Sequence, residues 1–421
     1  MAIVQLKSTN PAFSFLIKKN PATGLQIRSV RKGLAYGWST GEGSYGVYFK
    51  DADNEVSFKR DAGDSFDYLN VSRYNTPLFP LSAINEFFSV ALKAQHEQDL
   101  AGYRHSFYIP MIHIDRPHYI SFFASHLKNC TFTTEHQAHK SYSLLVETEE
   151  SLHYLLHVVS VLCLFLSMQG NEAIDITDEV LEKYLRSLNL IDAPFYIRSL
   201  FARHFLFTRD RFRKYKAEAE RSGRYAISLG YGGTAQQRRS YIASQLSFDK
   251  PILDIGCGEG FYAIPFAAKM EHSYYAVDID EERLELVKRK AQEKQAGNIA
   301  FFHSLAHYLE SANGETVDVI LTEVIEHMPL TEAAELIAAI CREVPFRQLI
   351  VTTPNADFNP HYELESFRHE DHKWELGEGE FRQWFAGLVQ GLPLSCEFVA
   401  IGDSVNGVAT TQGVIVTRKE E

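Results

Sequence analysis

The stretch "PILDIGCGEGFY" at residues 251–262 decides the fold of the C-terminal half of this chain. Its first residues are an apolar run typical of a buried strand. Gly256, Gly258 and Gly260 then allow the backbone to turn sharply and to approach a ligand closely. A helical pattern follows through "YAIPFAAKM". The glycine spacing is G-x-G-x-G, which differs from the G-x-G-x-x-G of the usual dinucleotide site.

Strands and helices alternate after this turn. Strand patterns occur in "YYAVDID" (274–280), "VDVILTE" (317–323) and "RQLIVTTP" (347–354), and helical patterns at 281–294 and 330–344 lie between them. Apolar strands that alternate with helices form a parallel sheet that is covered on both faces. We therefore predict an α/β domain over residues 228–421.

Two acidic residues indicate the ligand of the glycine turn. Asp278 ends the second strand, where an acid can accept hydrogen bonds from both ribose hydroxyls of an adenosine. Asp254 would repel a pyrophosphate, so a cationic sulfonium ligand with an ammonium group suits it better. The two motifs resemble class I (Rossmann-like) S-adenosylmethionine-dependent methyltransferases, and an NAD-binding domain is the structural alternative. The candidate donor-binding residues are Asp254, Gly256, Gly258, Asp278 and Ser304.

A second cluster follows the strand at 317–323. Glu323, Glu326 and His327 lie where open α/β sheets bind ligands, and positions i, i+3 and i+4 share a helical face. Two adjacent carboxylates repel each other unless a cation lies between them. A mixed Glu/His set suits Mg²⁺ or Mn²⁺ better than zinc. A surface helix with ordinary ion pairs is the alternative, but the position next to the donor site favours metal. A fourth ligand is expected from "FRHEDHKWE" (367–375).

The segments "EVIEHM", "LIVTTPNADFN" and "FRHEDHKWE…EFRQW" resemble the small-RNA 3′-terminal ribose 2′-O-methyltransferases. In eukaryotes these enzymes act in RNA silencing by protecting small RNAs. In bacteria they act in RNA repair with a polynucleotide kinase–phosphatase–ligase. The resemblance implies Glu323, Glu326, His327 and His372 as metal ligands. As a mechanistic hypothesis, His327 or His372, when not fully bound to the metal, acts as the base that takes the hydroxyl proton. The resemblance also implies S-adenosylmethionine, Mg²⁺ or Mn²⁺, and an RNA 3′ end as ligands.

This chain departs from the family at one segment. The usual "F-E-W-T-R" after the last histidine reads "W-E-L-G-E" at Trp374–Glu378, so the arginine is lost. We therefore expect this chain to bind the RNA end differently from other members of the family. His369 is expected not to bind the metal, and Glu370 and Asp371 are candidates for orienting the ligands.

The first half is expected to contain an α+β domain (1–150), rich in strands, and a helical module (151–227) that contacts a partner or RNA. By resemblance to the bacterial branch, this half works with the ligase partner. The apolar segment 154–168 is shorter than a membrane span, so we predict a buried helix and no membrane contact. The basic segment 209–224 is either a solvated helix face or an RNA-contacting one. Residues 228–240 read as a linker.

Charge and cysteine content limit the functions that remain. The 421 residues carry a net charge of −12, with +4 in residues 1–240 and −16 in the rest. Binding of a polyanion would therefore depend mainly on the first half. Five scattered cysteines without a C-x-x-C pair and no evident secretion signal predict a cytoplasmic protein. Two alternatives remain open: methyl transfer to a small molecule or a protein, and a non-catalytic scaffold for an RNA ligase.

Overall fold

The computed structural model describes residues 3–30, 33–51, 75–170, 174, 176–364 and 366–419. The chain divides into two compact units between Arg224 and Tyr225, and each unit is described by itself. The predicted boundary at 227/228 lies three residues after this division. The boundary between the units lies earlier because Ile227 and Ser228 pair with Val405 and Ser404 of the second unit.

The described residues of the first unit form a seven-stranded antiparallel sheet in the order β2-β3-β4-β1-β5-β7-β6. The segments "HSFYIPMIHI" (105–114) and "SYSLLVETEE" (141–150), which are rich in β-branched and aromatic residues, predict strands and form β5 and β7. The segment "SYGVYFKDADNEVSFKR" (44–60) predicts a hairpin, of which the first strand is β4 and the second lies outside the described residues. The strands are β1 (Ile3–Ser8), β2 (Gln26–Val30), β3 (Gly33–Gly41), β4 (Ser44–Asp51), β5 (His105–His113), β6 (Cys130–Ala138) and β7 (Ser141–Thr148).

The helix α6 (Leu152–Gln169) forms the core of this unit. By length and composition alone it could cross a membrane, but 89% of it is buried inside the unit, which is the environment of a core helix. It packs against strands β5 and β7 and against other helices of the unit. The predicted boundary at 150/151 therefore does not separate two compact bodies. The other helices are α1 (Phe13–Leu16), α3 (Leu78–Phe87), α4 (Ser89–Lys93), α5 (His118–His126), α7 (Asp178–Leu190), α8 (Phe195–Phe205) and α9 (Arg209–Glu220), with the 3-10 turn η1 (Pro21–Thr23).

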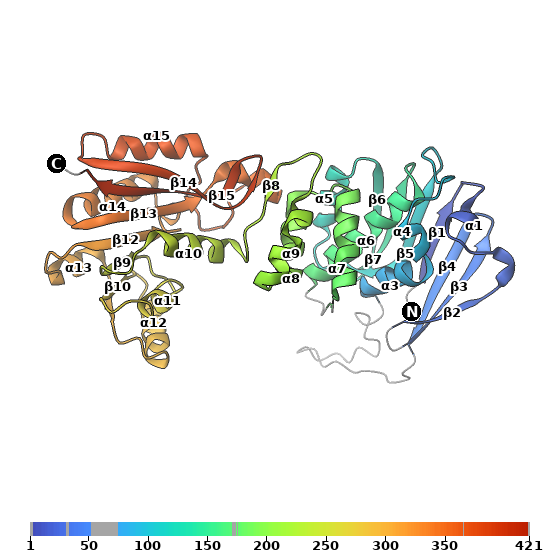
Figure 1. Ribbon diagram of the computed structural model, residues 1–421, viewed down its shortest axis with the longest axis horizontal. Helices are drawn as coiled ribbons and strands as arrows, with labels where there is room; N and C mark the ends of the chain where they lie inside the picture. The colour runs from blue at the N-terminus through green and yellow to red at the C-terminus, as the bar shows by residue number, and fades with distance from the viewer. Residues whose placement is uncertain are drawn as a thin grey trace. The chain divides into compact units, whose positions relative to one another are not determined.

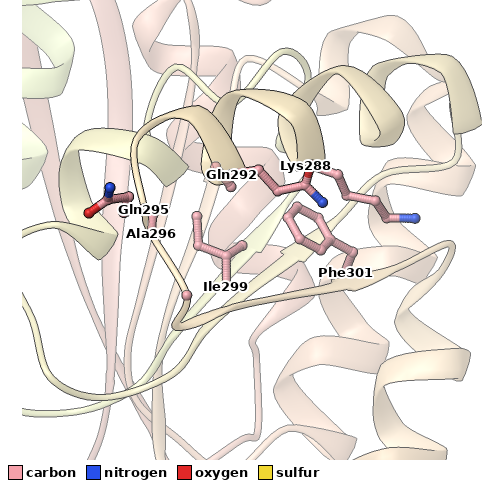
Figure 2. Close-up of a pocket in the computed structure, with 8 residues that line it drawn as sticks. Lys288, Gln292, Gln295, Ala296, Ile299 and Phe301 are labelled. Atoms are coloured by element: carbon pink, nitrogen blue, oxygen red, sulfur yellow. The ribbon is translucent and has the colours of Figure 1, made fainter.

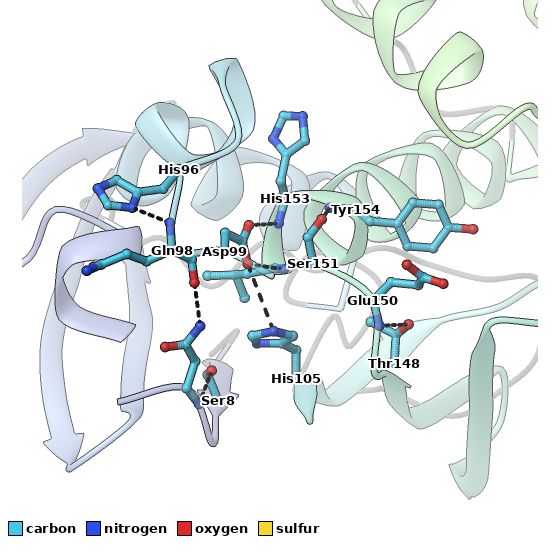
Figure 3. Close-up of polar contacts among 12 residues, drawn as sticks. Ser8, His96, Gln98, Asp99, His105, Thr148, Glu150, Ser151, His153 and Tyr154 are labelled. Carbon is cyan, nitrogen blue, oxygen red and sulfur yellow. Dashed lines mark hydrogen bonds and ion pairs between the residues drawn. The ribbon is translucent and has the colours of Figure 1, made fainter. Parts of the chain in front are cut away.

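A buried acid caps the first turn of α6 (Figure 3). The Asp99 carboxylate accepts hydrogen bonds from the backbone amides of Leu152 and His153, at 2.7 and 2.9 Å. The Ser151 hydroxyl accepts a third, from the amide of Tyr154. A buried helix needs such partners because its first amides have no acceptor within the helix.

The basic segment of the first unit is the helix α9. Its aromatic residues Phe212 and Tyr215 are buried in the unit, and most of its basic side chains lie in ion pairs. This arrangement favours the solvated helix face over the RNA-contacting one. The pairs are Arg211 and Lys214 with Asp178, Arg213 with Asp210, Lys216 with Glu220, and Arg221 with Glu218.

The second unit confirms the predicted α/β fold. Its sheet has the order β11-β10-β9-β12-β13-β15-β14-β8, and β9 to β13 run parallel while β15, β14 and β8 are antiparallel additions. Helices α14 and α15 pack on one face, and α10, α11 and α12 on the other (Figure 1).

The strands of this unit are β8 (Ile227–Ser228), β9 (Ile252–Ile255), β10 (Tyr274–Val277), β11 (Ile299–Phe302), β12 (Val317–Thr322), β13 (Phe346–Pro354), β14 (Leu394–Val405) and β15 (Val408–Arg418). The helices are α10 (Thr234–Gln245), α11 (Ala263–Ala267), α12 (Glu281–Glu293), α13 (Leu305–Ser311), α14 (Leu330–Glu343) and α15 (Glu378–Leu388), with the 3-10 turns η2 (Ile325–His327) and η3 (Ala356–Tyr362). The predicted linker at 228–240 thus contains the last residue of β8 and the start of α10.

Candidate functional site

The glycine turn after β9 has the backbone geometry that its sequence predicts. Gly256, Gly258 and Gly260 all have positive φ angles, of 76°, 51° and 80°. A Cβ on Gly256 would lie 2.3 Å from the Val324 side chain, so no other residue fits there without a shift. The amide of Gly258 donates to Asp278 at 2.7 Å, which ties the turn to the end of β10. The glycine turn and Asp278 therefore lie together at the carboxyl edge of the sheet.

Asp254 and Ser304, two of the predicted donor-binding residues, have protein partners in this structure. Asp254 is fully buried, and burial raises the pKa of its carboxyl to about 7. The Tyr274 hydroxyl donates to its Oδ2 at 2.6 Å, while Oδ1 has no partner in the described part of the chain. The Ser304 hydroxyl accepts from the amide of His307 and so caps α13. Ser304 follows β11 beside Asp278, because β10 and β11 run parallel.

Three of the four predicted metal ligands lie together. The potential ligand atoms of Glu326, His327 and His372 are all within 4.8 Å of one another. Glu326 is fully buried, and its Oε2 accepts a hydrogen bond from the Thr353 hydroxyl at 3.2 Å. Its Oε1 has no partner among the residues that the structure describes. Burial and the charge of Glu323 raise the pKa of Glu326 well above its usual range. A buried carboxylate oxygen without a donor, next to two imidazoles, fits a divalent cation.

Acidic residues orient both histidines of this cluster. His372 is held through Nδ1 by the Glu375 carboxylate at 2.6 Å, so Nε2 is the nitrogen left for a ligand. His327 faces Asp371 through Nδ1 at 3.1 Å, and burial lowers the pKa of its imidazole. His369, which we expected not to bind metal, contacts Asp371 and lies outside the cluster.

Glu375 is itself held by two further donors. Asn359 donates to its Oε2 from Nδ2 at 2.6 Å, and the amide of Arg368 donates to its Oε1 at 2.7 Å. The amide of Lys373 also donates to the carbonyl of Glu326 at 2.7 Å. These bonds fix the segment that carries His372 against the segment that carries Glu326.

Glu323, the fourth predicted metal ligand, is outside this group of three. Its Oε2 pairs with the Arg238 guanidinium at 3.0 Å, and its Oε1 accepts from the Thr352 hydroxyl at 3.2 Å. Its backbone has a φ of 54°, in the left-handed region that non-glycine residues seldom adopt. Such strain is frequent at functional sites.

Sequence reasoning missed Arg238 and Glu375. Arg238 lies in the stretch that composition predicts to be a linker. Glu375 is three residues after His372, and that spacing from a predicted metal ligand is the signal that could have found it.

A separate cavity of about 420 Å³ contains none of the predicted site residues (Figure 2). It lies between the end of α12 and the start of β11. Its lining includes Lys288, Gln292, Ile299 and Phe301. The donor turn and the acid–histidine cluster instead lie at the ends of β9, β10 and β12, so this cavity does not belong to the candidate site.

Two family models match this chain. One, described as the Hen1 N-terminal domain, matches residues 3–224, and the other, described as a methyltransferase domain, matches residues 252–344. The second match lies within the α/β unit and agrees with its topology. The C-terminal unit is therefore a class I S-adenosylmethionine-dependent methyltransferase domain, as the glycine turn and the strand order predicted.

Curated relatives share the name small RNA 2′-O-methyltransferase. The protein from Caenorhabditis elegans is 30% identical over 128 residues, which cover 27% of this chain and 29% of that protein. The protein from Xenopus tropicalis is 27% identical over 211 residues, which cover 44% of this chain and 54% of that protein. This chain therefore matches about half or less of the length of these relatives.

A solved structure matches this chain over nearly its whole length. One chain in the structure of the Pnkp1/Rnl/Hen1 RNA repair complex has a TM-score of 0.81 and 26% identity, and the match covers 99% of this chain and 100% of that chain. The Hen1 N-terminal model also covers more than half of the residues, and it ends where the first compact unit ends. The chain belongs to the Hen1 family.

Proposed function

We propose that this protein transfers the methyl group of S-adenosylmethionine to the 2′-hydroxyl of the 3′-terminal nucleotide of RNA, in RNA repair or in the protection of RNA ends. One observation carries the proposal: Oε1 of Glu326, which has no partner in the described part of the chain, lies with His327 and His372 on the sheet edge that also carries the glycine turn. The names of the curated relatives support the choice of RNA ribose as substrate.

The donor set of Glu326, His327 and His372 fits Mg²⁺ or Mn²⁺. Glu323, which pairs with Arg238 in this structure, would be the fourth ligand. When bound, the ion lowers the pKa of the ribose hydroxyls that it contacts and so makes a better nucleophile. Glu326 has the buried carboxylate that such an ion neutralises. Thr353 keeps that carboxylate in one orientation.

The histidines supply orientation and a proton acceptor. Glu375 keeps a proton on Nδ1 of His372, so Nε2 carries the lone pair for a ligand. His327 has a lowered pKa and is therefore neutral near pH 7. Since its Nδ1 faces Asp371, Nε2 is the atom that can take the proton of the 2′-hydroxyl when it is not bound to the ion.

This arrangement selects the chemistry of the RNA end and reads no base sequence. A terminal nucleotide with free 2′- and 3′-hydroxyls would present the vicinal diol that this donor set and its ion suit, and a 3′-phosphorylated or methylated end would lack that diol. Phosphate contacts would supply affinity.

The test uses tritiated S-adenosylmethionine and matched RNA oligonucleotides. Label should enter an end with both hydroxyls, and should not enter 2′-deoxy, 3′-deoxy or 3′-phosphate ends or any RNA in EDTA. Transfer that survives chelation, or that goes equally to all ends, would overturn the proposal. Transfer to a small molecule or a protein but not to RNA would favour the alternative substrate class.

We also propose that the first unit binds a kinase–phosphatase and an RNA ligase, and that the protein is cytoplasmic. The support for the partners is the end-to-end similarity to the Hen1 chain of the Pnkp1/Rnl/Hen1 complex. The support for the cytoplasm is the set of scattered cysteines without a C-x-x-C pair. Affinity purification of the full chain from its native cells should recover both partners. If the chain recovers neither partner but still methylates RNA, the proposal of the two partners is wrong and the proposal of RNA methylation stands.

A further inference from the structure

We propose that Arg238 is shared between the two ligand sites of the methyltransferase unit. It holds Glu323 in the ligand-free protein, and it turns to the carboxylate of the methyl donor when a divalent cation takes Glu323. Arg238 is thus a positioning residue that couples donor binding to cation binding. This inference rests on the proposed function, because it needs both ligands.

The position of Arg238 allows this double role. It lies on α10, and only 12% of its side chain is exposed. Its Nη1 pairs with Oε2 of Glu323 at 3.0 Å, and its Nε donates to the Tyr262 hydroxyl at 3.0 Å. Tyr262 lies two residues after Gly260, at the end of the glycine turn. The guanidinium of Arg238, which is largely buried, therefore contacts both Glu323, a predicted cation ligand, and Tyr262, which follows the glycine turn.

The charges around Glu323 explain why Arg238 holds it. Glu326 is fully buried and feels the negative charge of Glu323, so two acids share a region of low dielectric. A positive charge must balance them, and Arg238 provides one from the protein itself. The bond from Thr352 and the left-handed backbone at Glu323 fix the carboxylate toward Arg238.

Binding of the cation requires an exchange of partners. Glu323 lies outside the group formed by Glu326, His327 and His372, so it must leave Arg238 to serve as a fourth ligand. The guanidinium would then be buried without an anionic partner, which is costly. The donor is an amino acid with a carboxylate, and this group can replace Glu323 at Arg238. Cation binding therefore frees Arg238 for the donor carboxylate, and donor binding supplies the anion that Arg238 loses when Glu323 moves to the cation. Each ligand should thus tighten the binding of the other.

Calorimetry on the full chain tests this coupling. S-adenosylhomocysteine, which has the same carboxylate and cannot donate a methyl group, is titrated with and without Mn²⁺, and Mn²⁺ with and without S-adenosylhomocysteine. We expect Mn²⁺ to tighten S-adenosylhomocysteine binding by at least about fivefold, and the reverse effect to have the same size. In Arg238→Met the coupling factor should fall to about one, and Arg238→Lys should retain part of it because it keeps the charge.

Two further variants make the test specific. Arg239→Met removes the same charge from the next position of α10. The Arg239 guanidinium lies 4.3 Å from the centre of the Phe261 ring and donates to the Phe261 carbonyl, so this control should keep the wild-type coupling. Glu323→Gln leaves Arg238 in place and should lose the coupling, which provides a second test if Arg238→Met does not fold.

The outcomes separate this inference from the proposed function. Both ligands binding to the wild-type protein without coupling would overturn the role of Arg238 and leave the proposed function standing. Full coupling in Arg238→Met or in Glu323→Gln would overturn it in the same way. A wild-type protein that binds no Mn²⁺ would overturn both.

Discussion

His372 and Glu375 form a buried pair in which Nδ1 of the imidazole faces Oε1 of the carboxylate at 2.6 Å. Both side chains are largely withdrawn from solvent, with 8% and 0% exposed. The backbone amide of Arg368 and the side-chain amide of Asn359 also donate hydrogen bonds to the Glu375 carboxylate. The pair is therefore a fixed support that decides which nitrogen of His372 faces the cluster.

Replacing Glu375 should weaken metal binding without touching a ligand. We expect Glu375→Gln to reduce Mn²⁺ affinity by about 10- to 100-fold, because a neutral amide is a weaker acceptor for Nδ1–H than a carboxylate and fixes the tautomer and ring orientation of His372 less firmly. Calorimetric titration with Mn²⁺ measures this. Glu378→Gln is the control, because Glu378 pairs with Arg382 on the surface. An unchanged affinity in Glu375→Gln would show that the pair has no role in binding.

The buried charge of Glu326 should destabilise the protein when no cation is present. The folded-state pKa of Glu326 is raised, so the free energy of unfolding falls as the pH rises from the unfolded pKa of about 4.3 up to the folded pKa. Each unit of that shift costs about 1.4 kcal/mol when the carboxyl is ionised. Glu326→Gln should thus be more stable than wild type at pH 8 in EDTA, as urea unfolding would measure.

Added Mn²⁺ should reverse that order. The wild-type protein should gain stability with Mn²⁺ concentration, since the ion binds only the folded state, and Glu326→Gln should gain little. If Glu326→Gln is less stable than wild type in EDTA, the carboxylate is neutralised by groups of the protein.

Gly256 should tolerate no side chain. Its φ of 76° and the 2.3 Å approach of Val324 predict that Gly256→Ala costs about 1–3 kcal/mol and disrupts donor binding. Urea unfolding and titration with S-adenosylhomocysteine measure the two effects. Gly379→Ala is the matched control, because it lies in α15 with nothing within 4 Å of the added Cβ, and should be neutral or stabilising. Equal effects of the two substitutions would count against this account of the turn.

Asp99 should matter for stability of the first unit. Asp99→Ala removes the acceptor of two buried amides at the start of α6, so we expect a loss of about 1–2 kcal/mol in the free energy of unfolding. Asp99→Asn keeps an acceptor and should cost less. If both variants unfold like wild type in urea, the cap does not contribute measurably.

Local patterns predicted the shape of the glycine turn and the closeness of Glu326 and His327. The positive φ angles of the glycines, the parallel strands and the short spacing from Glu326 to His327 all follow from residues close in sequence. His372 lies 45 residues after His327, and only the resemblance to the family placed it in the cluster.

The partners of these residues were less predictable. Arg238 lies 85 residues before Glu323, in a stretch whose Gly, Ser and Gln content reads as a linker, so no local pattern connects the two. Trp374 reads as the aromatic of an altered RNA-binding segment, but it is 8% exposed and donates from Nε1 to the Met328 carbonyl. The predicted boundary at 150/151 falls inside one compact unit, because α6 packs against both the sheet and the other helices.

We expect one divalent cation to bind between Glu326, His327 and His372. Crystals soaked in Mn²⁺ and measured at the manganese absorption edge test this site. We predict a single anomalous peak in contact with these three side chains, and no such peak in His372→Ala. A wild-type crystal with the three side chains in place and no anomalous density between them would contradict it.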